Sequence, residues 1–309
     1  MTGYAQKTIC KPVTINGIGL HSGRYTHMTL RPAEADTGIV FIRTDVKDDR
    51  VIPARWDHVV DTRLCTVVGN TDGASVGTIE HLMSALCGCG IDNVTIEIDG
   101  PEVPVMDGSA MPFVEAIDSI GIKTLSAPRR AIRVLREVSL EQDGKRVSLK
   151  PAPMSIYSGE IEFDHAEIGR QTFSTSLLNG NFRHDIAQAR TFGFLHEVNY
   201  LRTQGLALGG SMDNAIVLGD DKVMNPGGLR FADEFIRHKL LDAIGDLYLA
   251  GGPILGAYYG VKAGHALNNR ILHELFSSRE NWTITDMTIP AEQTGASRTP
   301  AGSESLLVA

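Results

Sequence analysis

The sequence predicts an α+β fold of two domains with similar topology, each a helix layer packed on a sheet, with the functional site between them. Short apolar or alternating runs bounded by glycines predict strands, and a few amphipathic segments predict helices. A weak internal echo repeats the order helix, glycines, strand and second helix, and places His81 opposite His238. The 309 residues also exceed the usual size of one domain. We therefore expect domains over residues 1–127 and 128–289, a β-α-β insertion near 193–224, and a C-terminal tail over 290–309.

In the first half, apolar runs predict strands over residues 25–30, 39–42 and 94–98. The glycine-dense segment 15–23 is turn-like. It lacks the lysine and the spacing of a nucleotide-binding P-loop, so a plain strand and turn is favoured over a phosphate site. Helical spacing of apolar residues predicts a helix over 78–86, with Thr78 as its N-cap and a glycine stop. A second helix is expected over 110–120.

The second half begins with an expected linker over residues 126–130, which contains a proline and precedes renewed strand-like sequence. Further strands are expected over 131–134, 138–141, 147–150 and 255–261, with an Asp143-Gly144 turn before the third. The segment 182–190 is helix-like, and 198–217 is typical of a helix followed by a strand. Helices are also expected over 237–246 and from about Leu267 to Leu275, whereas no periodicity continues past residue 290.

Composition excludes several functional classes. The chain is 42% hydrophobic and 21% charged, as in ordinary globular proteins. Its 29 basic and 37 acidic residues give a formal charge of −8 without a basic stripe, so we expect no nucleic-acid partner. The first residues lack the apolar core of a signal peptide, and the longest apolar region, 240–261, is interrupted by aspartates. The protein is therefore expected in the cytoplasm, without an integral membrane segment and without an evident obligate protein partner.

The helix over 237–246 carries His238, Asp242 and Asp246 at positions i, i+4 and i+8, on a face separate from its apolar stripe. An imidazole and a carboxylate one turn apart can bind one Zn²⁺, but an ordinary solvated face with a His–Asp pair is the alternative. The H-E-x-x-H zinc motif is absent, so a metal site needs ligands from distant segments. Catalytic zinc takes three protein ligands, and His81, His238 and Asp242 fit that set. Cys87 and Cys89 have no second pair at metal-binding spacing, which favours apolar packing for both.

Seven motifs occur in order along nearly the whole chain. They are Gly17-Ile18-Gly19-Leu20-His21-Ser22-Gly23, Glu80-His81-Leu82, Gly90-Ile91-Asp92-Asn93, Pro104-Val105-Met106-Asp107-Gly108-Ser109, Ala189-Arg190-Thr191-Phe192-Gly193, residues 237–246 and Gly264-His265-Ala266-Leu267-Asn268-Asn269. Together they resemble the UDP-3-O-acyl-N-acetylglucosamine deacetylases, a family that removes an N-acetyl group early in bacterial lipid A synthesis. The two cysteines at 87 and 89 and the tail are not part of that family pattern.

The resemblance implies a catalytic site and a substrate. Zn²⁺ would be held by His81, His238 and Asp242, although a His₂-carboxylate set also suits Fe²⁺. Glu80 would be the general base, and His265 would be the general acid, held charged by Asp246. Thr191 would donate a hydrogen bond to the oxyanion. The substrate would be contacted by Phe192, Lys239 and Cys65, of which Lys239 adds positive charge. The insertion would form an apolar passage for the acyl chain, and simple core packing is the alternative reading of its composition.

Two other functions remain open at this stage. One is a metal-stabilised module that binds acylated sugar nucleotides without turning them over, and the other is a deacetylase of a different amide. The Glu80-His81 pair favours an enzyme, because a structural zinc site is normally closed by four ligands and needs no adjacent base.

Overall fold

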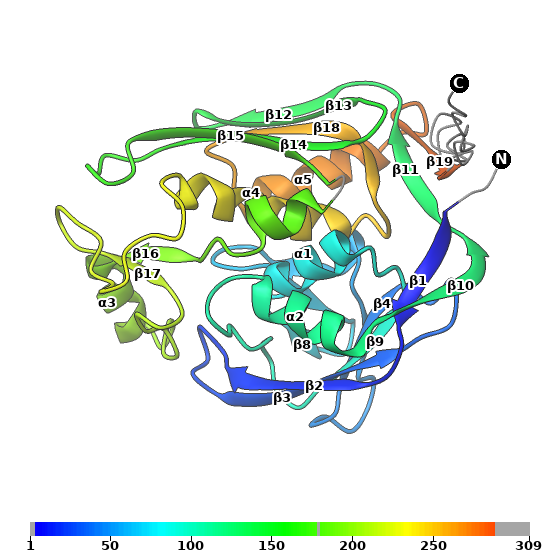
Figure 1. Ribbon diagram of the computed structural model, residues 1–309, viewed down its shortest axis with the longest axis horizontal. Helices are drawn as coiled ribbons and strands as arrows, with labels where there is room; N and C mark the ends of the chain where they lie inside the picture. Colours follow the sequence, from blue (N-terminus) through cyan, green and yellow to red (C-terminus); the bar gives the residue numbers. More distant parts are fainter. Residues whose placement is uncertain (1–3, 178–179, 288–309) are drawn as a thin grey trace, which may run out of the picture.

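The computed structural model describes residues 4–177 and 180–287 and has the predicted α+β class (Figure 1). In the first half, a five-stranded sheet has the order β2-β3-β9-β4-β5, in which only β4 and β9 are parallel neighbours. These strands span Val13–Ile18, Tyr25–Pro32, Val94–Ile98, Ile39–Arg43 and Val51–Pro53. A small second sheet contains β6 (Val59–Asp61), β7 (Val67–Gly69) and β8 (Ser75–Val76), after the 3₁₀ turn η1 (Trp56–His58).

The second half is built on a seven-stranded sheet. Its main path is β12-β13-β18-β11-β19, and β14 pairs with both β18 and β15. The strands are β11 (Arg130–Val134), β12 (Val138–Gln142), β13 (Lys145–Pro151), β14 (Ser155–Glu162), β15 (Arg170–Ser176), β18 (Ile254–Val261) and β19 (Trp282–Asp286). The Asp143-Gly144 turn between β12 and β13 has both residues at positive φ, as a two-residue hairpin turn requires.

Helices α1, α2, α4 and α5 lie between the two large sheets (Figure 1). Helices α1 (Glu80–Cys89) and α2 (Met111–Ile120) cover the first sheet, and α4 (Glu234–Tyr248) and α5 (His265–Phe276) cover the second. Helices α1 and α4 pack on each other at the centre, where a Cβ on Gly245 would lie only 2.0 Å from the carbonyl oxygen of Glu80. Buried apolar residues from both halves form one continuous core around this contact. The close approach of the two helices brings their polar residues together.

The segment after Arg190 projects from the second half as a β-α-β unit. Strands β16 (Phe192–Phe194) and β17 (Ile216–Leu218) are parallel and are joined through α3 (Leu195–Thr203). No residue of α3 is buried, so this helix does not pack into the main core.

Three local predictions were wrong. The expected linker at 126–130 is strand: β10 (Ile122–Pro128) pairs with β1 (Ala5–Ile9), and only Arg129 separates β10 from β11. Pro128 is tolerated because it is the last residue of a strand in a two-stranded ribbon. By contrast, the strand and turn favoured over 15–23 are confirmed, since β2 continues to Ile18 and a turn follows it.

Thr78 is not the N-cap of α1. It has a φ of 53°, and its hydroxyl donates to Glu102 rather than to the helix; the helix begins at Glu80. Segment 182–190 contains only a single π turn (Phe182–Ile186), because the backbone of Ala189 and Arg190 is instead bonded to side chains of α4.

The exact domain boundary at 127/128 stays a prediction, and the expected tail at 290–309 lies outside the described residues. Among the helices of residues 4–177 and 180–287, none has the length and apolar character needed to cross a membrane.

Candidate metal centre and active site

Three predicted metal ligands converge at the contact between α1 and α4. His81 lies in the first turn of α1, and His238 and Asp242 lie one turn apart on α4. One ligand atom from each lies within 4.8 Å of the others, and all three residues are buried. Asp242 Oδ1 is 3.3 Å from His238 Nε2 and 3.6 Å from His81 Nε2. The two halves of the chain therefore contribute to one cluster.

The donor atoms of this cluster fit a divalent metal ion. Asp242 Oδ1 is buried and has no hydrogen-bond partner among the described residues, which is costly for a carboxylate oxygen unless a cation binds it. His238 Nδ1 lies 3.1 Å from the carbonyl oxygen of Ala189, so this nitrogen donates and Nε2 keeps a free lone pair. Together with His81, these residues form the three-ligand set of an open catalytic site.

Electrostatics favour the protonation states that bind metal. Burial lowers the pKa of His238 to about 3, which keeps its imidazole neutral. Burial raises the pKa of Asp242, but His238 and Lys239 outweigh that effect and hold the pKa well below its usual value. Lys239 Nζ lies 2.9 Å from Asp242 Oδ2, the oxygen that does not face the imidazoles. Metal binding would therefore require little proton release.

A second cluster lies beside the first. Ligand atoms of Glu80, Asp246 and His265 also lie within 4.8 Å of one another. Glu80 is adjacent to His81, and its Oε1 is 3.9 Å from His265 Nε2. Its Oε2 accepts a 3.0 Å hydrogen bond from the backbone N–H of Thr66, and burial raises its pKa.

Asp246 orients His265 from one turn beyond Asp242. Its Oδ2 lies 2.9 Å from His265 Nδ1 and also accepts from Asn268 Nδ2, while Oδ1 accepts from the hydroxyl of Thr66. Burial lowers the pKa of His265, but the charges of Asp246 and Glu80 outweigh it and raise that pKa to about 9. His265 is thus a cation near neutral pH and can act as an acid.

Lys239 and Phe192 lie beside the metal cluster, and Thr191 directly precedes Phe192 in the chain. Lys239 Nζ is 5.5 Å from the centroid of the Phe192 ring, and that ring meets His238 edge-on at 6.3 Å. The backbone of Thr191 bonds to Gly108 and to Ile216. Thr191 therefore belongs to the segment that reaches His238 through Ala189, but among the described residues its hydroxyl makes no hydrogen bond that would fix its direction.

Cys65 lies in the wall of a cavity of about 510 Å³, between the first half and the inserted β-α-β unit. Leu64, Thr78 and Leu206 are among the other lining residues. Burial, with a smaller effect of Glu80, raises the pKa of the Cys65 thiol to about 12, so it stays protonated and serves as a contact surface.

The sequence reasoning missed four residues that hold this site, namely His21, Thr66, Glu102 and Asn268. His21 lines the same cavity as Cys65, and neither ring nitrogen has a partner among the described residues. The glycine-rich motif around His21 was the feature of the sequence that could have indicated this role. Thr66 and Asn268 bond to Asp246 from distant segments, and no spacing rule marks either position.

Comparison with known proteins places the chain in a family. The family model described as UDP-3-O-acyl N-acetylglycosamine deacetylase matches residues 6–277. Proteins named UDP-3-O-acyl-N-acetylglucosamine deacetylase are similar along most of their length. The one from Phenylobacterium zucineum is 49% identical over 280 residues (90% of this chain, 96% of the relative), and that from Syntrophotalea carbinolica is 50% identical over 281 (91% of each). The one from Shewanella oneidensis is 45% identical over 303 residues (96% and 98%). The resemblance carried by the seven motifs is confirmed, and the chain belongs to the UDP-3-O-acyl N-acetylglycosamine deacetylase family.

Proposed function

We propose that the chain is a zinc-dependent hydrolase that removes the acetyl group of UDP-3-O-acyl-N-acetylglucosamine, giving a free amine and acetate, in lipid A biosynthesis in the cytoplasm. The substrate is the one named for its relatives. The observation that supports the reaction type is the pair of adjoining clusters. One is a His₂-carboxylate set with an unsatisfied Asp242 oxygen, and the other pairs Glu80 with a cationic His265.

His81, His238 and Asp242 would hold the metal. A bound Zn²⁺, or Fe²⁺ as the alternative, would polarise the acetyl carbonyl and lower the pKa of the attacking water. The protein side chains then have two proton transfers to perform, one at the water and one at the leaving nitrogen.

Glu80 would accept the proton of the attacking water. Its side chain is buried, and burial raises its pKa above that of an ordinary carboxyl group, as suits a general base. Its hydrogen bond from the Thr66 N–H fixes one oxygen and leaves the other to face His265. As the C–N bond breaks, His265 would give its Nε2 proton to the amine nitrogen, while Asp246 holds the ring through Nδ1.

The remaining predicted residues would bind and stabilise the substrate. Lys239 places a half-buried cation next to Asp242, and Thr191 would donate to the developing oxyanion. Phe192 and Cys65 would contact the sugar nucleotide and the acyl chain. The absence of buried residues in α3 favours an acyl passage over simple core packing for the insertion, as does the cavity that Leu206 shares with the first half.

Incubation of the purified chain with UDP-3-O-acyl-N-acetylglucosamine tests this function. We expect equimolar amine and acetate, detected by mass spectrometry, and loss of both products after metal removal with recovery on adding Zn²⁺. Substrate binding without acetate release would instead support the binding-module hypothesis. Release of acetate only from other N-acetylated compounds would support a deacetylase of different specificity.

A further inference from the structure

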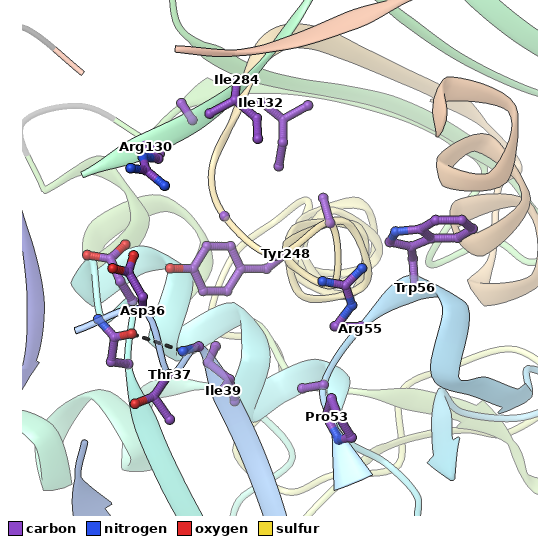
Figure 2. A pocket seen from close by; sticks show the side chains of 18 of the residues that line it. Asp36, Thr37, Ile39, Pro53, Arg55, Trp56, Arg130, Ile132, Tyr248 and Ile284 are labelled. Carbon is purple, nitrogen blue, oxygen red and sulfur yellow. Dashed lines mark hydrogen bonds between the residues drawn. The ribbon is translucent and has the colours of Figure 1, made fainter. Parts of the chain in front are cut away.

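A second large cavity lies at the C-terminal end of α4 and shares no lining residue with the metal centre (Figure 2). Its volume is about 740 Å³, within the range of roughly 300–1,000 Å³ found for small-molecule sites. Tyr248, which lines it, follows Asp242 by six residues and so lies about 9 Å further along the helix axis. The cavity is therefore a separate site on the same helix.

The inner surface of this cavity is apolar and aromatic. Figure 2 shows the Tyr248 ring in the middle, with Ile132 and Ile284 on one side and Pro53 on the other. Tyr248 is fixed there because its hydroxyl donates to the carbonyl of Ile91. Trp56 forms a further wall, and Trp282 lines the cavity next to Phe276. A flat apolar group would find several ring surfaces to contact.

Three guanidinium groups stand around this apolar surface. Arg55 and Arg130 lie on opposite sides of Tyr248 in Figure 2, and Arg279 lies 4.0 Å over the ring of Trp282. Within residues 4–177 and 180–287, the ion pairs of Arg55 and Arg130 are exposed ones, with Asp57 at 3.1 Å and Asp286 at 3.9 Å. Exposed pairs are weak and a ligand can displace them.

Two carboxylates also line the cavity, but each has a partner. Asp92 is bound by Arg129 at 2.8 Å, and both side chains are largely buried. Asp36 accepts a hydrogen bond from Gln6 at 2.8 Å. The lining residues therefore keep an excess of positive charge, and arginine binds carboxylate and phosphate groups with matched geometry.

We propose that this cavity is a binding site for a small aromatic anion. Its ring lies against the partly exposed Trp56, and its carboxylate or phosphate is bound by the surrounding arginines. The site is connected to α4 and α5 through Trp56. The backbone N–H of Trp56 donates to the carbonyl of Leu249 at the end of α4, and the backbone carbonyl of Trp56 accepts from the side-chain amide of Asn269 on α5. This inference does not rest on the proposed function.

Tryptophan fluorescence gives a direct test, because the chain has two tryptophans and both line this cavity. The full-length chain is titrated with phenyl phosphate, with benzoate and with inorganic phosphate, and calorimetry provides a second measurement. We expect a saturable change with phenyl phosphate or benzoate, and the tighter of the two identifies the anionic group. The affinity for inorganic phosphate alone should be at least about tenfold lower, since this ion cannot contact the aromatic walls.

Variants separate this site from non-specific binding. Arg55→Ala and Arg279→Ala should each weaken binding about tenfold or more, whereas Arg170→Ala, which removes an exposed arginine outside the cavity, should not. Arg279→Gln serves as a second variant that keeps side-chain length. Removal of metal with EDTA should leave binding unchanged. The proposal is overturned by the absence of saturable binding, by equal binding in the arginine variants, or by loss of binding on metal removal.

Discussion

His265 and Asp246 set the expected pH dependence of the reaction. Because the pKa of His265 is about 9 and the protonated ring is the acid, activity should fall as pH rises through that value. Asp246→Asn removes the charge that raises this pKa, so the alkaline limb should move to lower pH and the rate should fall. Rate profiles of both proteins, with Asp233→Asn immediately before the first residue of α4 as a matched change, test this. An unchanged alkaline limb would assign the acid elsewhere, with Lys239 as the next candidate.

Glu80 offers a second test at the level of single residues. Glu80→Gln keeps the size of the side chain but cannot accept a proton, so turnover should fall by about 10²–10⁴-fold. Metal content, measured by mass spectrometry, should stay near that of the unchanged protein, because Glu80 is not among the three proposed ligands. Glu97→Gln on β9, a half-buried residue paired with Arg31, is the matched control. A parallel loss of metal and rate would make Glu80 a ligand instead.

The sequence predicted the residues whose chemistry depends on local spacing, and missed those whose role depends on tertiary contacts. His238, Asp242 and Asp246 follow from helical periodicity, because i, i+4 and i+8 share a face. Glu102 was missed because its role is visible only in three dimensions. It accepts hydrogen bonds from the backbone N–H groups of His21 and Ser22 and from the hydroxyl of Thr78.

At the scale of elements, the approach of α1 to α4 depends on Gly245. A Cβ there would collide with the backbone of Glu80, so Gly245→Ala should destabilise the fold by about 1–3 kcal/mol and reduce activity by moving Glu80 and His81. Urea unfolding together with a rate assay measures both effects. Gly227→Ala is the control, because its Cβ would meet no atom within 4 Å. Full stability in Gly245→Ala would contradict this account of the helix contact.

Glu102 connects the turn after β2 to Thr78, two residues before the start of α1. Glu102→Gln leaves one oxygen in place of two for three donors, so the free energy of unfolding should drop by about 1.5–3 kcal/mol. Chemical denaturation measures this change. Glu102→Asp, which keeps both oxygens on a shorter side chain, should recover part of the lost stability. Equal stability of Glu102→Gln and the parent protein would show that these hydrogen bonds make no net contribution to the free energy of unfolding.

Element prediction succeeded where the pattern was strong and failed where pairing with a distant segment decided the structure. Strands β3, β4, β9 and β18 have apolar or alternating sequences and were predicted. Strands β14 and β15 were not, because Gly159 and several serines and threonines weaken their pattern, and their strand form comes from pairing with each other and with β18. The same holds for β10, whose partner β1 lies more than 100 residues away.

At the scale of the whole molecule, the two halves share one core and one polar site. The weak internal echo was sufficient to place His81 opposite His238, but the packing of α1 directly on α4 could not be read from periodicity. That contact is what sets Glu80 and His81 against three residues of α4, and it makes the proposed metal site a product of the complete fold.

The central claim is that one metal ion is bound jointly by His81 from the first half and by His238 and Asp242 from the second. Anomalous scattering, measured across the zinc and iron absorption edges on crystals grown without added metal, tests it most directly. We expect one strong peak within bonding distance of all three side chains, with the edge identifying the element. A peak bound by other residues would contradict the account. So would the absence of a peak between three well-resolved side chains, in crystals of protein that is active on the substrate.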